Sequence, residues 1–205
     1  YNGCNKLTGG GKMNCLDVCC GSSKGASDVY VEEGIKLGEE LAKQNITLIY
    51  GGASVGLMGA VANAVLENGG QVIGVMPRFL EQREISHQQL SKLIIVESMH
   101  ERKAKMEELA DGFIALPGGP GTLEEFFEIF TWAQLGLHDK PFGLLNINGY
   151  FQPLVNLFQH MINERFLDEK YQTMIHINDK PRQLLELLNS YQPPAIKTYV
   201  HEKQT

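Results

Sequence analysis

Short apolar runs alternate with longer helical patterns from residue 14 to residue 191, and this alternation constrains the fold more than any other feature. The apolar runs predict seven strands, at residues 14–20, 46–50, 71–76, 92–96, 112–116, 142–147 and 174–177. The helical periodicity predicts six helices, at residues 27–44, 55–68, 99–110, 121–137, 151–164 and 180–191. Strands separated by helices favour right-handed crossovers and a mostly parallel sheet. The sequence therefore predicts one α/β domain, a doubly wound, Rossmann-like sheet with helices on both faces.

The two ends of the chain differ from this alternating region. Residues 1–12 begin with Tyr1 and contain three consecutive glycines, so we expect an added or leader segment outside the fold. Residues 192–205 are polar and contain Pro193-Pro194, which predicts an irregular tail. The folded domain is expected to span residues 13–191.

Composition excludes some classes of function. The 205 residues carry a net charge of −6 and show no basic stripe, which disfavours nucleic-acid binding. No apolar stretch approaches the roughly 20 residues that a membrane-spanning helix requires. The four cysteines are Cys4, Cys15, Cys19 and Cys20, and their spacing matches neither a disulfide framework nor a zinc knuckle. A reduced, cytoplasmic protein that interacts with neither nucleic acid nor membrane is predicted.

Three glycine-rich loops follow predicted strands. They are Gly21-Ser22-Ser23, the segment 51–59 that begins Gly51-Gly52, and Pro117-Gly118-Gly119-Pro120-Gly121-Thr122-Leu123-Glu124-Glu125. Parallel strands place these loops at one sheet edge, where backbone N–H groups and a helix N-terminus suit a phosphate. Tight strand-to-helix turns also favour glycine, so a purely structural role stays open.

Other phosphate and cofactor sites fit poorly. The glycines from Gly51 to Gly56 lack G-x-G-x-x-G spacing, and Pro77 ends the next strand, where a dinucleotide site would have an acid. No P-loop motif and no recognisable pyridoxal-phosphate lysine occur in the sequence. Ser22 and Ser54 lack the context of a nucleophile, so a hydroxyl that binds phosphate is favoured. The phosphate is expected to belong to a mononucleotide or a sugar.

Two helices carry charged candidates. Ser98 and Glu101 form a capping-box pattern, and Arg102 and Lys103 follow within the apolar stripe of that helix. These cations oppose the helix dipole, so either they extend past the apolar face to water or they bind an anion, and the second interpretation is favoured.

The helix at residues 121–137 places Glu124 and Glu125 in its expected first turn. Adjacent helical positions diverge by roughly 100°, so the two acids are not expected to share one role. Thr131 lies on the same face as Glu124.

These motifs resemble those of the LONELY GUY (LOG) family of cytokinin-activating nucleoside 5′-monophosphate phosphoribohydrolases, formerly labelled possible lysine decarboxylases. The similarity covers residues 14 to about 191 and is carried by the segments 20–23, 50–59, 99–103, 117–125, 132–136 and 138–141. Two departures are visible. Pro120 occupies a variable motif position, and Asp17 puts an acid into the first strand.

The resemblance implies a nucleotide-binding catalytic domain at residues 13–191. It implies hydrolysis of the N-glycosidic bond of an adenosine-type 5′-monophosphate, cytokinin riboside 5′-monophosphate or AMP, to free base and ribose 5-phosphate. Such a reaction passes through an oxocarbenium-like transition state, which a carboxylate stabilises while it orients water. Arg102 and Glu125 match the catalytic pair, and no metal or organic cofactor is implied.

The resemblance and the glycine loops together give the expected substrate contacts. These are Glu84, Arg102, Lys103, Gly118, Gly119, Pro120, Gly121, Thr122, Leu123, Glu124, Glu125, Thr131, Gly51, Gly52, Gly21 and Ser22. The family also implies a homodimer, for which the phenylalanine-rich helix with Trp132 offers apolar surface. A non-catalytic nucleotide or cofactor carrier on the same fold remains the alternative.

Overall fold

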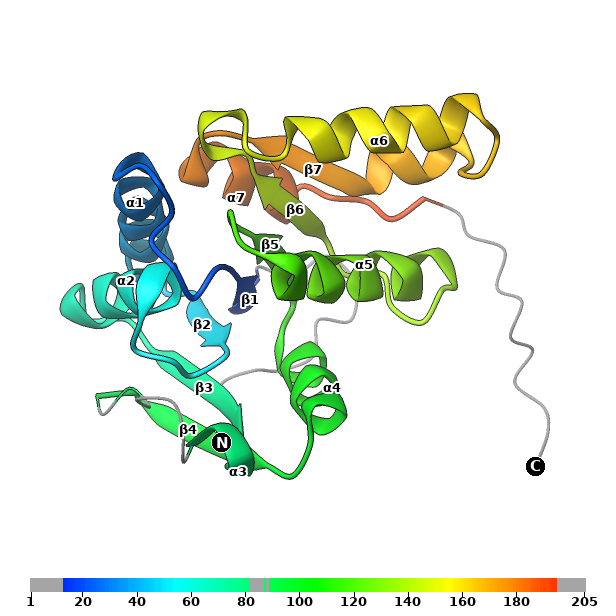
Figure 1. Cartoon of the computed structure of the whole chain (residues 1–205). Coiled ribbons are helices and arrows are strands. Elements are labelled where there is room, and N and C mark those ends of the chain that lie inside the picture. The colour runs from blue at the N-terminus through cyan, green and yellow to red at the C-terminus, as the bar shows by residue number, and fades with distance from the viewer. Residues whose placement is uncertain (1–12, 82–86, 88, 195–205) are drawn as a thin grey trace, which may run out of the picture.

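Seven parallel strands form one sheet in the computed structural model, which describes residues 13–81, 87 and 89–194 (Figure 1). The strand order is β4-β3-β2-β1-β5-β6-β7. The strands are β1 (Cys15–Cys19), β2 (Thr47–Tyr50), β3 (Val72–Pro77), β4 (Lys92–Val96), β5 (Gly112–Ala115), β6 (Phe142–Leu145) and β7 (Ile175–Asn178). The predicted α/β fold is confirmed. The expectations for residues 1–12 and for most of the tail concern parts of the chain outside the described residues.

Helices cover both faces of the sheet. One face carries α1 (Val29–Gln44), α2 (Gly56–Glu67) and α7 (Pro181–Asn189), and the other carries α4 (Met99–Leu109), α5 (Pro120–Gln134) and α6 (Gln152–Asn163). Three short elements complete the order, the helix α3 (Arg78–Glu81) and the 3₁₀ turns η1 (Ile147–Gly149) and η2 (Glu169–Met174). Among the described residues, none of the helices is long and apolar enough to cross a membrane.

The central strand β1 sends alternate side chains to the two faces. Leu16 and Val18 join the core beneath α1, α2 and α7, whereas Cys15 and Cys19 pack on the side of α4 and α5. By the same alternation Asp17 lies on the α4–α5 side, where it is 9 % exposed. Its acid does not disturb the ladder, because it keeps parallel register with a residue of β2 and one of β5.

The chain reverses its winding direction between β1 and β5. The crossover that follows β1 leads to β2 on one side of the sheet centre, and the crossover that follows β5 leads to β6 on the opposite side. Ligands of open parallel sheets bind at such a reversal, beyond the carboxyl ends of the two strands. The candidate site lies there.

Two details of the expected elements were wrong. Helix α5 begins at Pro120 and ends at Gln134, so Glu124 and Glu125 fall in its second turn. The early end has a local cause: Gly136 has a φ of 73°, and the next residue closes the helix by donating to the Trp132 carbonyl.

The cysteine expectation was also wrong at one position. Cys15 is disulfide-bonded, while Cys19 and Cys20 are free. The spacing of the four cysteines was compared only with patterns of several disulfides, and a single disulfide requires no particular spacing.

Candidate active site

The loops that follow β1 and β5 lie against each other at the carboxyl edge of the sheet. The Gly21 N–H donates to the Pro117 carbonyl at 3.1 Å. A Cβ on Gly21 would lie 3.2 Å from the Gly118 Cα, and a Cβ on Gly118 would lie 2.8 Å from the Gly21 nitrogen. Only glycine allows two backbones to approach so closely. The first and third glycine loops of the sequence therefore meet, as the parallel sheet predicts.

Helix α5 directs its N-terminus to the same edge. Pro120 takes the first helical position, where its missing N–H would have had no partner in any case. The N–H groups of Thr122 and Leu123 donate to the Gly119 carbonyl at 3.1 and 3.3 Å. Gly119 and Gly121, in contrast, make no backbone bond through N–H to any described residue, and a Cβ on either would meet nothing within 4 Å. The backbone at these two glycines leaves room for an anion, which the positive helix end favours.

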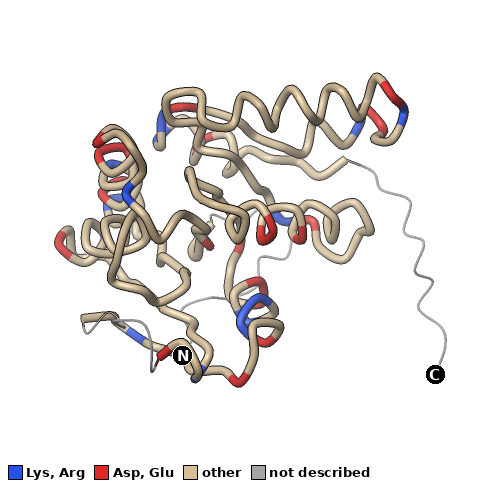
Figure 2. Tube along the Cα trace, in the orientation of Figure 1, with Lys and Arg blue, Asp and Glu red and all other residues tan. Residues whose placement is uncertain are grey.

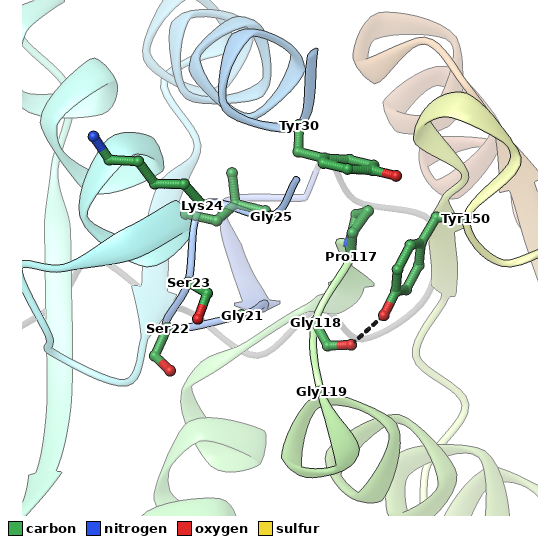
Figure 3. A pocket seen from close by; sticks show the side chains of 11 residues that line it. Gly21, Ser22, Ser23, Lys24, Gly25, Tyr30, Pro117, Gly118, Gly119 and Tyr150 are labelled. Carbon is green, nitrogen blue, oxygen red and sulfur yellow. Dashed lines mark hydrogen bonds between the residues drawn. The ribbon is translucent and has the colours of Figure 1, made fainter. Parts of the chain in front are cut away.

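A cavity of about 350 Å³ lies beside these loops, beneath the start of α1 (Figure 3). Tyr30 and Tyr150 form one wall, with their rings edge to face at a centroid distance of 6.0 Å. The Tyr150 hydroxyl donates to the Gly118 carbonyl at 2.5 Å and thereby fixes the loop. The remaining lining residues are Gly21, Ser22, Ser23, Lys24, Gly25, Leu57, Pro117 and Gly119.

Sequence reasoning missed the two tyrosines of this cavity. Tyr150 follows β6 at the same carboxyl edge as the glycine loops. Because ligands bind at this edge of a parallel sheet, the segment after β6 could also have been predicted to contribute to the site. Tyr30 lies within α1, and nothing in its periodicity distinguishes it from a core residue.

Arg102 and Glu125 meet across the interface of α4 and α5. One guanidinium nitrogen of Arg102, Nη2, lies 3.6 Å from Oε1 of Glu125, and the two side chains are only 13 % and 20 % exposed. Within the described part of the chain, the buried Nε of Arg102 has no hydrogen-bond partner. The guanidinium therefore retains unused donor capacity beside the carboxylate.

Gly51, at the end of β2, makes room for this arginine. A Cβ at Gly51 would lie 2.3 Å from Arg102 Nη2, far inside contact distance. The absence of a side chain at Gly51, in the second glycine loop, therefore leaves space for the Arg102–Glu125 ion pair. Its neighbour Gly52 is needed for the backbone itself, which has a φ of 84° there.

We expect Gly51→Ala to displace the guanidinium and, with Arg102 in the role that the LOG resemblance implies, to lower kcat/KM for nucleotide hydrolysis by about 10- to 100-fold, since a misplaced catalytic group costs that much. The clash falls on the end of a flexible side chain, so the melting temperature should change little. Steady-state kinetics and thermal unfolding measure both. In an Arg102→Ala background the same alanine should cost nothing further. An equal loss in both backgrounds would contradict the assignment.

Lys103 lies next to this pair and is fully engaged. Its ammonium contacts Glu124 Oε1 at 2.6 Å and Glu128 Oε1 at 3.0 Å. Figure 2 shows acidic positions along α5 and both basic and acidic positions on α4 beneath it. The side chains of Arg102 and Lys103 are each only 13 % exposed. The structure therefore contradicts the alternative in which both cations extend past the apolar face into water.

Burial and the nearest opposite charges shift the pKa values of Glu125 and Lys103 in opposite directions. Burial raises the pKa of Glu125 above its usual value, and the Arg102 guanidinium opposes that shift. Burial lowers the pKa of Lys103, but its bonds to Glu124 and Glu128 outweigh burial, and the net shift is upward. The electrostatics therefore distinguish two adjacent acids: Glu124 serves the lysine, and Glu125 lies deeper beside the arginine.

Comparison with known proteins identifies the family. The model of a family described as possible lysine decarboxylase matches residues 58–188. A probable cytokinin riboside 5′-monophosphate phosphoribohydrolase, LOGL2 of Oryza sativa subsp. japonica, is 48 % identical over 86 % of this chain and 72 % of its own length. The chain belongs to the LOG family. A second member, LOG3 of Arabidopsis thaliana, is 43 % identical over 89 % of this chain and 85 % of its own length.

Solved structures with little sequence similarity share the LOG fold. A molybdenum cofactor binding protein of Rippkaea orientalis has a TM-score of 0.66 at 21 % identity, covering 87 % of this chain and 97 % of its own. The Moco carrier protein of Chlamydomonas reinhardtii has a TM-score of 0.63 at 19 % identity, covering 86 % and 100 %. At this identity the likeness establishes the fold alone.

The remaining residues expected from the LOG resemblance lie in different environments. Ser22 is exposed at the cavity, whereas Thr122 is buried with its hydroxyl beneath the Gly118 backbone. Leu123 is half-buried and packs on the aromatic core under α5. Thr131 is exposed on α5, two turns beyond Glu124 and outside the cavity lining. Glu84 lies outside the described residues.

Neither Arg102 nor Glu125 lines the cavity, so the site has two parts that share the start of α5. Within the described parts of the chain, no three His, Cys, Asp or Glu side chains gather as a metal ion would require.

Proposed function

We propose that this protein hydrolyses the N-glycosidic bond of an adenosine-type nucleoside 5′-monophosphate, either a cytokinin riboside 5′-monophosphate or AMP. The observation that carries the proposal is the buried Arg102–Glu125 pair behind the open backbone of Gly119 and Gly121. The family relatives carry the name of this activity. The products are the free base and ribose 5-phosphate.

The chemistry assigns a role to each group. The bond between ribose C1′ and the base nitrogen breaks, and its electron pair leaves with the base, which takes up a proton. The Glu125 carboxylate stabilises the positive charge that develops on the ribose and accepts a proton from the water that attacks C1′. Arg102 keeps Glu125 ionised and in place.

The phosphate fits the start of α5. The free N–H groups of Gly119 and Gly121, together with the positive helix end, supply donors for its oxygens. Lys103 is bonded to two carboxylates, so we assign it to positioning Glu124 and α5 rather than to direct contact with phosphate. Ser22 and Gly21 complete the loop side of the cavity.

Incubation with AMP and with an N6-prenylated adenosine 5′-monophosphate, followed by chromatography of the free bases, tests the function. Equal amounts of base and ribose 5-phosphate are expected from at least one of the two. The second candidate, a carrier that binds a nucleotide or cofactor without chemistry, has the same fold as known molybdenum cofactor proteins. Tight binding of AMP with no release of base by the intact protein would favour the carrier.

We also propose a homodimer. Large apolar side chains are exposed just beyond the carboxyl ends of α5 and α6, which lie on the same side of the molecule in Figure 1: Leu135, Leu137 and Phe166, of which Phe166 is 88 % exposed. Leu157, midway along α6, is also exposed. Light scattering at micromolar concentration should give twice 22.8 kDa. A single species of 22.8 kDa would refute the dimer.

A cytoplasmic location is the last part of the proposal. It rests on the two free thiols of Cys19 and Cys20, whereas the disulfide at Cys15 does not favour a reducing compartment. Cell fractionation with an antibody against the chain tests it, and recovery only in a secreted or organellar fraction would overturn it.

A further inference from the structure

Asp17 is a buried acid with no apparent structural purpose. It lies on the central strand β1, where it is 9 % exposed, and its Oδ1 has no hydrogen-bond partner among the described residues. No ion pair links it to any described cation within 4 Å, although Arg102 and Lys140 lie in the same layer. An ionised carboxylate that is buried without partners costs far more than a neutral acid of the same shape.

The position of Asp17 relates it to the proposed catalytic pair. Cys15 and Cys19, two residues before and after it, pack against the cores beneath α4 and α5 respectively, so Asp17 projects between these two helices. Arg102 and Glu125 join the same two helices. Asp17 therefore lies beneath the pair, and a second negative charge there would compete with Glu125 for one guanidinium.

We propose that Asp17 is a positioning residue that remains a neutral acid beneath the Arg102–Glu125 pair and so reserves the guanidinium for Glu125. The role rests on the hydrolytic function proposed above. With Asp17 neutral, one carboxylate and one guanidinium face the substrate. With Asp17 ionised, two carboxylates share the guanidinium, and Glu125 loses part of the contact that holds it in place.

The surrounding charges agree with this assignment. Burial raises the pKa of Asp17 well above its usual value of 3.8, and the negative charge of Glu125 raises it further. The cations Arg102 and Lys140 oppose the shift, but Lys140 is held 2.5 Å from the carboxylate of Glu107. The Cys19 thiol lies on the same side of β1 as Asp17 and Cys20 packs on the opposite side, and burial raises the pKa values of both thiols.

The first test needs no substrate. A raised pKa in the folded state means that Asp17 costs stability once the pH exceeds the unfolded value near 3.8, and the cost grows as the pH rises toward the folded value. Asp17→Asn should therefore melt about 2–4 °C or more above the wild type at pH 7–8, with the gain shrinking toward pH 4. Glu33→Gln is the matched control, because Glu33 is equally buried but paired with Lys36 at 2.8 Å, and it should show no such gain.

The second test is the pH profile of kcat/KM for the nucleotide that the wild type cleaves. Asp17→Asn should keep kcat/KM within about threefold at pH 7 and should lack the fall at alkaline pH that ionisation of Asp17 causes in the wild type. A variant that folds but is inactive at pH 7, or an unchanged alkaline limb together with no gain in melting temperature, would overturn the proposal. If the wild type releases no base, the proposed function fails, and the melting experiment still decides whether Asp17 is neutral.

Discussion

Replacing Glu125 with glutamine should lower the rate of base release from AMP by about 10²–10⁴, the usual contribution of a positioned acid–base group. Glutamine keeps the size and hydrogen bonding of the side chain but removes the charge that stabilises the ribosyl cation. Helix α5 should survive, because glutamine has nearly the same helix propensity as glutamate and the residue lies past the first turn. Chromatography of the released base gives the rate, and equilibrium dialysis with AMP should show that binding is largely kept.

Glu124→Gln is the matched control. Glu124 is 57 % exposed at the side chain and shares Lys103 with Glu128, which remains in place to hold the lysine. Turnover within about tenfold of the wild type is expected, since one partly exposed ion pair contributes little. The opposite pattern, with Glu125→Gln active and Glu124→Gln inactive, would show that the roles of the two acids are reversed.

Removing the 5′-phosphate from the substrate should have a comparably large effect. Two charge-assisted hydrogen bonds, from Gly119 and Gly121, are worth roughly 1.5–3 kcal/mol each. Their loss predicts that kcat/KM for adenosine lies about 10²–10⁴ below that for AMP, at roughly 1.4 kcal/mol per factor of ten. Parallel assays with the two substrates measure this ratio.

Gly121→Ala tests whether the phosphate lies at this helix. A methyl group there meets no protein atom within 4 Å, so the fold should be unaffected, but it fills space that the ligand is expected to use. The preference for AMP over adenosine should shrink in this variant. If the wild type cleaves adenosine as efficiently as AMP, the assignment of the phosphate to the start of α5 is wrong.

The sheet could be predicted from the sequence because its signals are local. Seven apolar runs separated by helical periodicity place every strand within two residues of its observed ends, and a parallel sheet then brings the glycine loops to one edge. The capping interaction at α4 was also visible, and the Ser98 hydroxyl accepts from the Glu101 N–H at 3.1 Å. The short elements α3, η1 and η2 are too brief for periodicity to detect.

The arrangement of charges could not be predicted from the sequence. The pattern placed Arg102 and Lys103 near an anion, but it did not show that Glu124 and Glu128 together would engage the lysine. That pairing depends on how α4 and α5 lie against each other on the sheet. Tyr30 was missed for the same reason, because its place at the cavity follows from the packing of α1 near the loop after β6.

The reversal of winding between β1 and β5 divides the site between two halves of the chain. Of the proposed site, residues 13–110 supply Gly51 and Arg102, while residues 111–191 supply Gly119 and Glu125. The halves are joined by the pairing of β1 with β5 and by bonds such as Asp111 to the Cys15 N–H, 96 residues apart in sequence. Neither half contains all the residues of the proposed site, so we expect base release to begin only once the two halves have packed against each other. The rate of base release during refolding therefore reports the last long-range step of assembly, whereas helix content reports earlier local ones.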